Sequence, residues 1–129
     1  MVNVQSFHHV SIVVTDLVRA REFYKTVIGL KEIKRPNLDS DGAWFGIGEQ
    51  QVHLIVHPTG QTLRQEHTLD TRDGHLALRV KSYHDTIEHL NSHHVSFKMN
   101  PHSKTGWPQI YVCDPDGNII ELNAESLDG

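Results

Sequence analysis

Short apolar runs alternate with turn residues along the chain, and their period predicts strands and helices in a repeating order. Alternation of apolar and polar residues, with many β-branched side chains, is typical of strands that bury one face. Two other segments place apolar residues at helical spacing, behind Asp16 and Ser82, which are residue types that cap helices. The predicted helices cover residues 17–29 and 82–94, and the predicted strands cover residues 7–14, 30–35, 43–48, 51–57, 75–80, 95–99, 109–113 and 118–123.

The predicted order, β-α-β-β-β, occurs twice, and equivalent residues are separated by a nearly constant length of chain. His9 and His75 are 66 residues apart (75 − 9), and His53 and Glu121 are 68 apart (121 − 53). A repeat of this length indicates two equivalent modules, each a four-stranded sheet with one helix across a face. We therefore expect an α+β fold in a single domain over residues 1–129, with module one at about 7–57, a linker at 58–74 and module two at about 75–123.

The stretch "DPDG" separates the last two predicted strands. Asp114, Pro115 and Gly117 occupy the first, second and fourth positions that a type I turn favours. The final strand is therefore expected to be one arm of a hairpin, and this apolar strand contains a single acid, Glu121.

Four predicted strands have one aliphatic face and one face with a histidine or glutamate. Successive side chains of a strand point to opposite faces, so Ile120 and Leu122 share a face that Glu121 does not. On three other strands, the same alternation puts a histidine on the face opposite the aliphatic side chains. If the two sheets form one surface, the residues that point into the same concavity are His9, His53, His75 and Glu121.

Imidazole and carboxylate groups are the usual protein ligands of divalent zinc, iron, manganese, nickel and cobalt. Ligands on strands are held rigidly, and three or four of them leave coordination positions open for water or substrate. The pattern therefore predicts one divalent metal ion, either Ni, Zn, Mn, Fe or Co.

Other side chains share the predicted ligand face and are candidates for contact with a substrate. Arg79 could bind a carboxylate, although a structural ion pair is an equal alternative. Gln109 and Tyr111 alternate with Ile110 and so face the same way as each other. On the third strand, either Trp44 or Phe45 should supply an apolar wall. Of the two, Trp44 is the candidate for contact with a substrate.

Composition and charge narrow the class of protein. A net charge of −4 with scattered Lys and Arg does not favour nucleic-acid binding. The sequence has no apolar run that would span a membrane and no secretory signal pattern, so no membrane partner is expected. Its one cysteine, Cys113, excludes an intrachain disulfide and indicates a reducing, cytoplasmic environment.

The segments "HHVSIVVTDLVRAREFYKTVIGL", "GHLALRV" and "DPDGNIIEL" together resemble the signature segments of the vicinal oxygen chelate superfamily. That group includes glyoxalase I, extradiol dioxygenases, fosfomycin-resistance thiol transferases and bleomycin-binding proteins. The resemblance covers about residues 7–123. It implies paired βαβββ modules that form a cup-shaped, eight-stranded mixed sheet around a divalent metal ion, commonly in a homodimer with a small-molecule substrate.

The resemblance also implies which residues bind the metal. The family's first-strand ligand lies seven residues before the Asp that caps the first helix, which is His9 and not His8. The ligands on the fifth and last strands correspond to His75 and Glu121. On strand four, bacterial-type glyoxalase I has a glutamate where this chain has His53. That departure counts against a glyoxalase I assignment and leaves the general base open.

Four functions are consistent with this resemblance. A glyoxalase I-like lyase or isomerase agrees with the length of the chain and with its "DPDGNIIEL" ending. In such an enzyme, Glu121 or His53 is expected to move the proton next to the substrate carbonyl. An Fe(II) extradiol dioxygenase agrees with a set of two histidines and one carboxylate, although most such enzymes have two double-module domains. A fosfomycin thiol transferase agrees with the same ligands, but the chain shows no convincing loop for potassium or the phosphonate. A non-catalytic module that binds a small molecule is the fourth.

Overall fold

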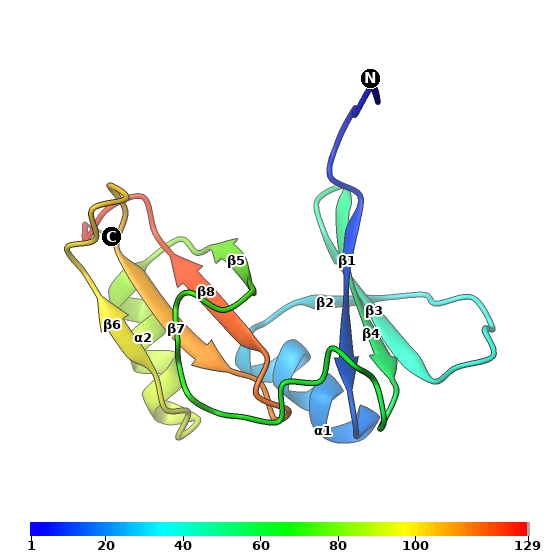
Figure 1. Cartoon of the computed structure of the whole chain (residues 1–129). Coiled ribbons are helices and arrows are strands. Elements are labelled where there is room, and N and C mark those ends of the chain that lie inside the picture. Colours follow the sequence, from blue (N-terminus) through cyan, green and yellow to red (C-terminus); the bar gives the residue numbers. More distant parts are fainter. Residues whose placement is uncertain (129) are drawn as a thin grey trace. The chain divides into compact units, whose positions relative to one another are not determined.

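The computed structural model describes residues 1–128, which divide into two compact units that meet in sequence between Leu63 and Arg64. Each unit contains one four-stranded mixed sheet and one helical segment. The predicted α+β class, with two βαβββ modules, is thereby confirmed. Figure 1 shows the two sheets and their helices in sequence colours.

The first unit begins its sheet with an edge strand that pairs in parallel with the last strand of the unit. The strand order is β1-β4-β3-β2, and every neighbouring pair except β1 and β4 is antiparallel. Its elements are β1 (His9–Val14), α1 (Leu17–Glu22), the π-helix η1 (Phe23–Val27), β2 (Lys31–Ile33), β3 (Gly42–Ile47) and β4 (Gln50–Val56).

The second unit repeats this connectivity. The strand order is β5-β8-β7-β6, again with one parallel pair, β5 and β8. Its elements are β5 (His75–Arg79), α2 (Tyr83–Ser92), β6 (Lys98–Asn100), β7 (Gln109–Cys113) and β8 (Ile119–Asn123). The edge strands β2 and β6 are shorter than predicted, because each forms only three residue pairs with its neighbour.

Both helices begin at the predicted caps. The Asp16 side chain accepts a hydrogen bond from the Arg19 backbone N–H at 3.0 Å, and the Ser82 hydroxyl accepts one from the Asp85 N–H at 3.1 Å. These bonds satisfy N–H groups that have no partner within the first helical turn. Among residues 1–128, no helix is both long enough and apolar enough to cross a membrane.

The first helix departs from the prediction of one regular α-helix over residues 17–29. It widens at Phe23 into a π segment, in which the Ile28 N–H donates to the Phe23 carbonyl oxygen at 3.0 Å. Phe23 and Tyr24 are adjacent in sequence and both buried, with ring centroids 5.3 Å apart. The wider turn is consistent with placing two consecutive aromatic rings in the core, which the spacing of a regular α-helix does not favour.

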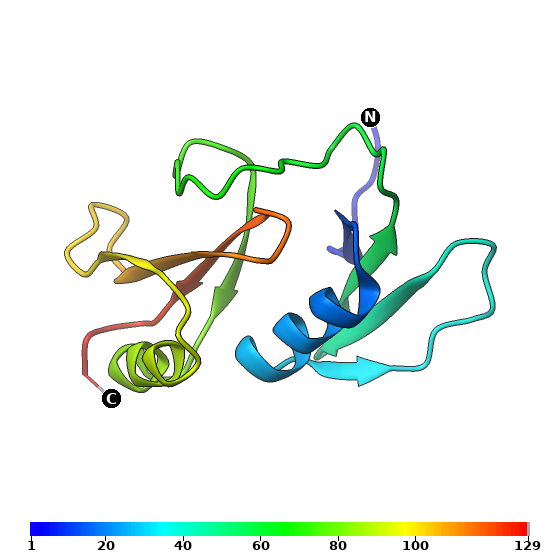
Figure 2. The ribbon, with the colours of Figure 1, turned by 90° about the horizontal axis from the view of Figure 1, so that it is seen from below.

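Each sheet buries an aliphatic face, as the alternation of side chains predicts. In the first unit, Val52 and Leu54 of β4 are almost fully buried together with Phe45. In the second, Ile120 and Leu122 of β8 are buried together with Ile110. Figure 2 shows α1 and α2, each on one side of its own sheet. Burying each large aliphatic or aromatic side chain contributes about 1.5–3 kcal/mol.

The turn between β7 and β8 forms as predicted at "DPDG". The Gly117 N–H donates to the Asp114 carbonyl oxygen at 3.0 Å, the bond that closes a four-residue turn. Gly117 has a φ of +86°, a left-handed conformation that favours glycine. This turn sets the register of β8 and therefore the position of Glu121.

Candidate functional site

Strand register places the four predicted ligands as two equivalent pairs. In the first unit, His53 of β4 lies opposite Ser11, two residues after His9. In the second, Glu121 of β8 lies opposite Ala77, two residues after His75. Residues two apart on a strand share a face, so each unit brings a β1 or β5 histidine next to the ligand candidate on the adjacent strand.

In the first unit, the His53 ring lies between two other rings. It stacks on His9, with centroids 4.1 Å apart and an interplanar angle of 17°, and on Trp44, at 4.0 Å and 2°. Trp44 is paired directly with His53 across β3 and β4, while Phe45 points to the buried core. The structure thus shows that Trp44, and not Phe45, shares the face of the histidines.

The neutral form of His53 is favoured by its surroundings. Burial lowers the pKa of His53 below its usual 6.5, and the nearby His9, His8 and Arg35 lower that pKa further. The His53 Nε2 atom lies 2.7 Å from the Gln51 Oε1 atom, which can only accept, so Nε2 carries the proton. The Nδ1 atom is then the one with a lone pair for a metal ion or a proton.

His8, which the family resemblance does not identify as a ligand, contacts His9. Its Nδ1 atom lies 2.8 Å from the His9 Nδ1 atom, and the two rings meet edge to face with centroids 5.0 Å apart. One of the two nitrogens must therefore carry the proton that the other accepts. His8 can thereby influence which nitrogen of His9 is available to a metal.

In the second unit, the Glu121 carboxylate is buried, with 5% of the residue exposed, and four side chains donate to it. Oε1 accepts from Gln109 Nε2 at 3.2 Å and from the Tyr111 hydroxyl at 3.1 Å. Oε2 accepts from Trp107 Nε1 at 3.3 Å and from Asn123 Nδ2 at 2.6 Å. Both oxygens of this carboxylate are thus held in fixed directions.

These donors keep Glu121 ionised. Burial alone would raise the pKa of Glu121, but hydrogen bonds from Asn123, Tyr111, Gln109 and Trp107 outweigh burial and hold that pKa below its usual 4.5. Conversely, burial and the bond to Glu121 raise the pKa of Tyr111 to about 12. Tyr111 is therefore a stable donor at neutral pH and is not suited to act as a base.

His75 lies beside this carboxylate in a defined orientation. Its Nε2 atom is 3.4 Å from Glu121 Oε1, and its Nδ1 atom is 2.9 Å from the Asp73 carbonyl oxygen. Because a carbonyl oxygen only accepts, Nδ1 must be the protonated nitrogen. Metal-binding histidines commonly donate one ring N–H to a carbonyl and coordinate through the other nitrogen.

The predicted substrate-binding residues of the second unit are occupied by contacts within that unit. Gln109 donates to Glu121 and accepts from Asn100 Nδ2 at 3.1 Å, so both ends of its amide have partners. Arg79 donates through Nε to Asn123 Oδ1 at 2.6 Å. Arg79 therefore reinforces Asn123, the closest donor to Glu121. Direct contact of Gln109, Tyr111, Arg79 or Trp44 with a substrate stays a prediction.

Several residues that contact the predicted ligands were not identified from the sequence. Asn123 follows Glu121 by two residues, so alternation already placed it on the ligand face, and Gln51 has the same relation to His53. Trp107 lies in a loop before β7, where no periodicity indicates the direction of a side chain. The Asp73 carbonyl is a backbone group, which a search for side-chain types does not detect.

The side-chain types are those that bind divalent metal ions: imidazole groups in one unit, and an imidazole and an ionised carboxylate in the other. The structure brings His9 together with His53, and His75 together with Glu121. Within residues 1–128, no three or more His, Cys, Asp or Glu side chains are gathered so as to hold a metal. Burial raises the pKa of the Cys113 thiol, so this cysteine does not supply a reactive thiolate.

A family profile described as Glyoxalase/Bleomycin resistance protein/Dioxygenase superfamily matches residues 6–122. This match covers most of the chain and shows that the chain belongs to that superfamily. The repeated βαβββ modules agree with it.

Two curated relatives are lyases or glyoxalases by name. The lactoylglutathione lyase of Escherichia coli O157:H7 is 31% identical over 123 residues, which cover 91% of this chain and 90% of that protein. The protein named Glyoxylase I 4 of Arabidopsis thaliana is 29% identical over 129 residues, covering 95% of this chain and 72% of that protein.

Solved structures share the fold. A Bacillus anthracis protein assigned to the glyoxalase family has a TM-score of 0.79 and 26% identity, covering 96% of this chain and 98% of its own. A variant of the fosfomycin resistance protein FosX from Listeria monocytogenes has a TM-score of 0.71 and 24% identity, covering 99% and 96% of the two chains. That FosX variant was crystallised with Mn(II) and 1S,2S-dihydroxypropylphosphonic acid.

Proposed function

We propose that this chain is a divalent-metal-dependent enzyme of the glyoxalase I type, a lyase or isomerase of a small oxygenated substrate. The observation that carries the proposal is the pair of equivalent ligand positions, His9 with His53 and His75 with Glu121, set by the same strand register in both units. The similarity to lactoylglutathione lyase over nearly the full length of both chains supports the choice of reaction.

The four side chains are proposed to bind one divalent ion, which is Ni, Zn, Mn, Fe or Co. The His53 pKa, lowered by burial, leaves that ring neutral and able to bind a metal, and the hydrogen-bond donors around Glu121 leave the carboxylate charged. When bound, such an ion acts as a Lewis acid on a substrate oxygen and acidifies the neighbouring C–H bond. Crystallisation of the related fold of FosX with Mn(II) agrees with this cofactor class.

We propose His53 as the main proton carrier, in preference to Glu121. Glu121 accepts four hydrogen bonds and has a lowered pKa, so its affinity for a proton is weak. His53 is neutral, and the Gln51 amide fixes its proton on Nε2, so Nδ1 has the only lone pair of the ring. That lone pair serves one role at a time, so His53 is proposed to accept a proton only when Nδ1 is not bound to the metal ion. His53 occupies the strand-four position at which bacterial-type glyoxalase I has a glutamate.

Substrate contacts are proposed for two groups of residues. The Trp44 ring lies beside His53 and offers an apolar surface to the part of a substrate that does not react. Arg79, Gln109 and Tyr111 are proposed to contact polar substrate groups when their present hydrogen bonds exchange. The single cysteine and the family resemblance support a cytoplasmic homodimer.

Turnover of the glutathione hemithioacetal of methylglyoxal, after loading with each metal in turn, tests this function. His53→Ala is expected to reduce kcat by about 10²–10⁴-fold, the usual contribution of a general base. His53→Glu restores a proton-accepting carboxylate and is expected to retain turnover. If wild type shows no turnover with any of the five metals, the lyase proposal is wrong.

A second candidate is an Fe(II) ring-cleaving dioxygenase. The set of His9, His75 and Glu121 supplies two histidines and one carboxylate, which is the ligand type of non-haem iron oxygenases. Oxygen consumption with catechols by the anaerobically Fe(II)-loaded protein distinguishes this candidate. Consumption by wild type and none by Glu121→Ala would favour the dioxygenase.

A further inference from the structure

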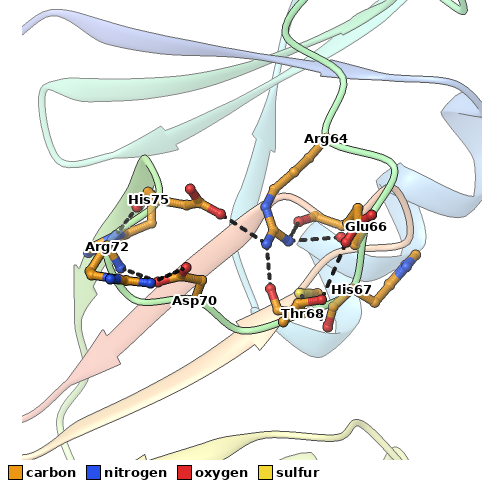
Figure 3. A network of polar contacts seen from close by, with 10 residues as sticks. Arg64, Glu66, His67, Thr68, Asp70, Arg72 and His75 are labelled. Atoms are coloured by element: carbon orange, nitrogen blue, oxygen red, sulfur yellow. Dashed lines mark hydrogen bonds and ion pairs between the residues drawn. The ribbon is translucent and has the colours of Figure 1, made fainter.

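Arg64 joins the segment that precedes β5 to the turn between β7 and β8. Its guanidinium donates to three backbone carbonyl oxygens: Glu66 at 2.8 Å, Gly117 at 2.9 Å and Thr68 at 2.5 Å. It also contacts Asp73 Oδ2 at 3.2 Å, and only 18% of its side chain is exposed. Figure 3 shows this group of contacts around Arg64, with His75 at the end of the same segment.

The segment lies directly against the turn. The Gln65 N–H donates to the Asp116 carbonyl oxygen at 3.1 Å, and His67 Nε2 lies 3.1 Å from the Pro115 carbonyl oxygen. A Cβ atom at Gly117 would overlap the Glu66 carbonyl, so a larger residue there would displace the segment. The Arg64 contacts therefore fix the path of a segment that has no strand or helix of its own.

That path ends at His75. The Asp73 carbonyl accepts from His75 Nδ1 at 2.9 Å, and the Asp73 N–H donates to the Asp70 carbonyl at 3.1 Å. Arg64 contacts the side chain of Asp73. The residue whose carbonyl orients the His75 imidazole is therefore held by Arg64. An arginine has five N–H donors in a planar fork and is suited to holding several acceptors at once.

We propose that Arg64 is a positioning residue for His75. By holding Asp73, it keeps the proton of the imidazole on Nδ1 and directs Nε2 toward Glu121, 3.4 Å away. The consequence for metal binding rests on the proposed function, whereas the orientation of His75 is a property of the metal-free protein. A group that orients a ligand histidine typically changes metal affinity 10–100-fold when it is lost.

The test is the tautomer of His75 in metal-free protein, read from the ring nitrogen signals of ¹⁵N-histidine NMR and assigned with His75→Gln. The spectra are recorded about two pH units above the usual histidine pKa. Wild type should show His75 with its proton on Nδ1. Arg64→Met should give a mixture of both tautomers and bind Zn²⁺ about 10–100-fold more weakly.

Arg72→Met is the matched control. Arg72 lies in the same segment and pairs with Asp70 at 3.1 Å, but 90% of its side chain is exposed. It should leave both the tautomer and the Zn²⁺ affinity unchanged. Asp73→Ala is the second variant, for use if Arg64→Met does not fold. It removes one contact of Arg64 and keeps the three contacts with backbone carbonyls. It should also give a mixture of both His75 tautomers.

The two proposals fail in different ways. If Arg64→Met and Asp73→Ala fold and keep His75 in the wild-type tautomer, the positioning role is wrong, whatever the metal does. If wild type has the fixed tautomer, loses it in these variants and yet binds no metal, Arg64 does position His75 and the metal-dependent function is the claim that fails.

Discussion

The Glu121 carboxylate accepts hydrogen bonds from four side chains and lies beside His75, so the directions of both its oxygens are fixed by neighbouring residues. The alternation along β8 predicted that this acid faces away from Ile120 and Leu122, which are buried on the other side. Its ionised state could not be predicted in the same way, because the donor Trp107 comes from a loop.

Tyr111 should remain protonated to an unusually high pH. Burial and the bond to Glu121 raise the pKa of its hydroxyl to about 12. Because the pKa is higher in the folded protein than in the unfolded chain, the stability that this hydroxyl contributes is present below the usual pKa of 10. That stability is lost as pH rises through about 12. NMR of ¹³C-labelled tyrosine, with Tyr111→Phe to assign the signal, measures this. Ionisation of Tyr111 near pH 10 in the folded protein would contradict the hydrogen bond to Glu121.

At the scale of elements, the β7–β8 turn and the segment before β5 act together. The turn itself was predicted from "DPDG", since these residues match the preferences of a type I turn. The packing of residues 64–74 on that turn was not predicted, because the segment has no period and its contacts are mainly between backbone groups and Arg64. The π segment at Phe23 was missed because the apolar spacing fits a regular helix nearly as well.

Gly117→Ala should destabilise the second unit. The residue has a φ of +86°, and an added Cβ would overlap the Glu66 carbonyl. The left-handed conformation alone costs an alanine about 1–2 kcal/mol, before any displacement of the segment. Urea unfolding measures the loss.

Gly74→Ala is the control for this substitution. Gly74 has no left-handed φ and no atom within 4 Å of an added Cβ. Its free energy of unfolding should change by no more than about 0.5 kcal/mol, as for most surface substitutions. Equal stabilities of the two variants would mean that the segment does not pack against Gly117.

At the scale of the whole molecule, the internal repeat made most of the fold predictable. Two βαβββ modules followed from the order of periodic segments and from separations of 66 (75 − 9) and 68 (121 − 53) residues. The observed registers preserve the repeat, because His9 and His75 occupy equivalent places relative to His53 and Glu121. The reaction was less predictable, since one histidine differs from the glyoxalase I pattern and ligand types alone do not distinguish a lyase from a dioxygenase.

The protein should lose stability in acid through Glu121 and His53. Glu121 has a lowered pKa, so its contribution is present above 4.5 and is lost as pH falls through the lower, folded-state value. His53 also has a lowered pKa, so below 6.5 the unfolded chain binds protons first and the free energy of unfolding falls. Urea unfolding from pH 7 downward should show a shallower decline for His53→Gln than for wild type below 6.5. Equal slopes would contradict a neutral, buried His53.

The central claim is that the two repeat-related pairs bind one divalent metal ion. Zn²⁺ titration by calorimetry should therefore show one site per chain in wild type and none in His9→Ala/Glu121→Ala. His89→Ala/His93→Ala is the matched control, because it removes two histidines of the α2 region, with ring centroids 4.5 Å apart, and leaves both pairs intact. Wild-type binding by this control and loss only in the first variant is the predicted result. Equal Zn²⁺ binding by wild type and His9→Ala/Glu121→Ala would contradict the claim.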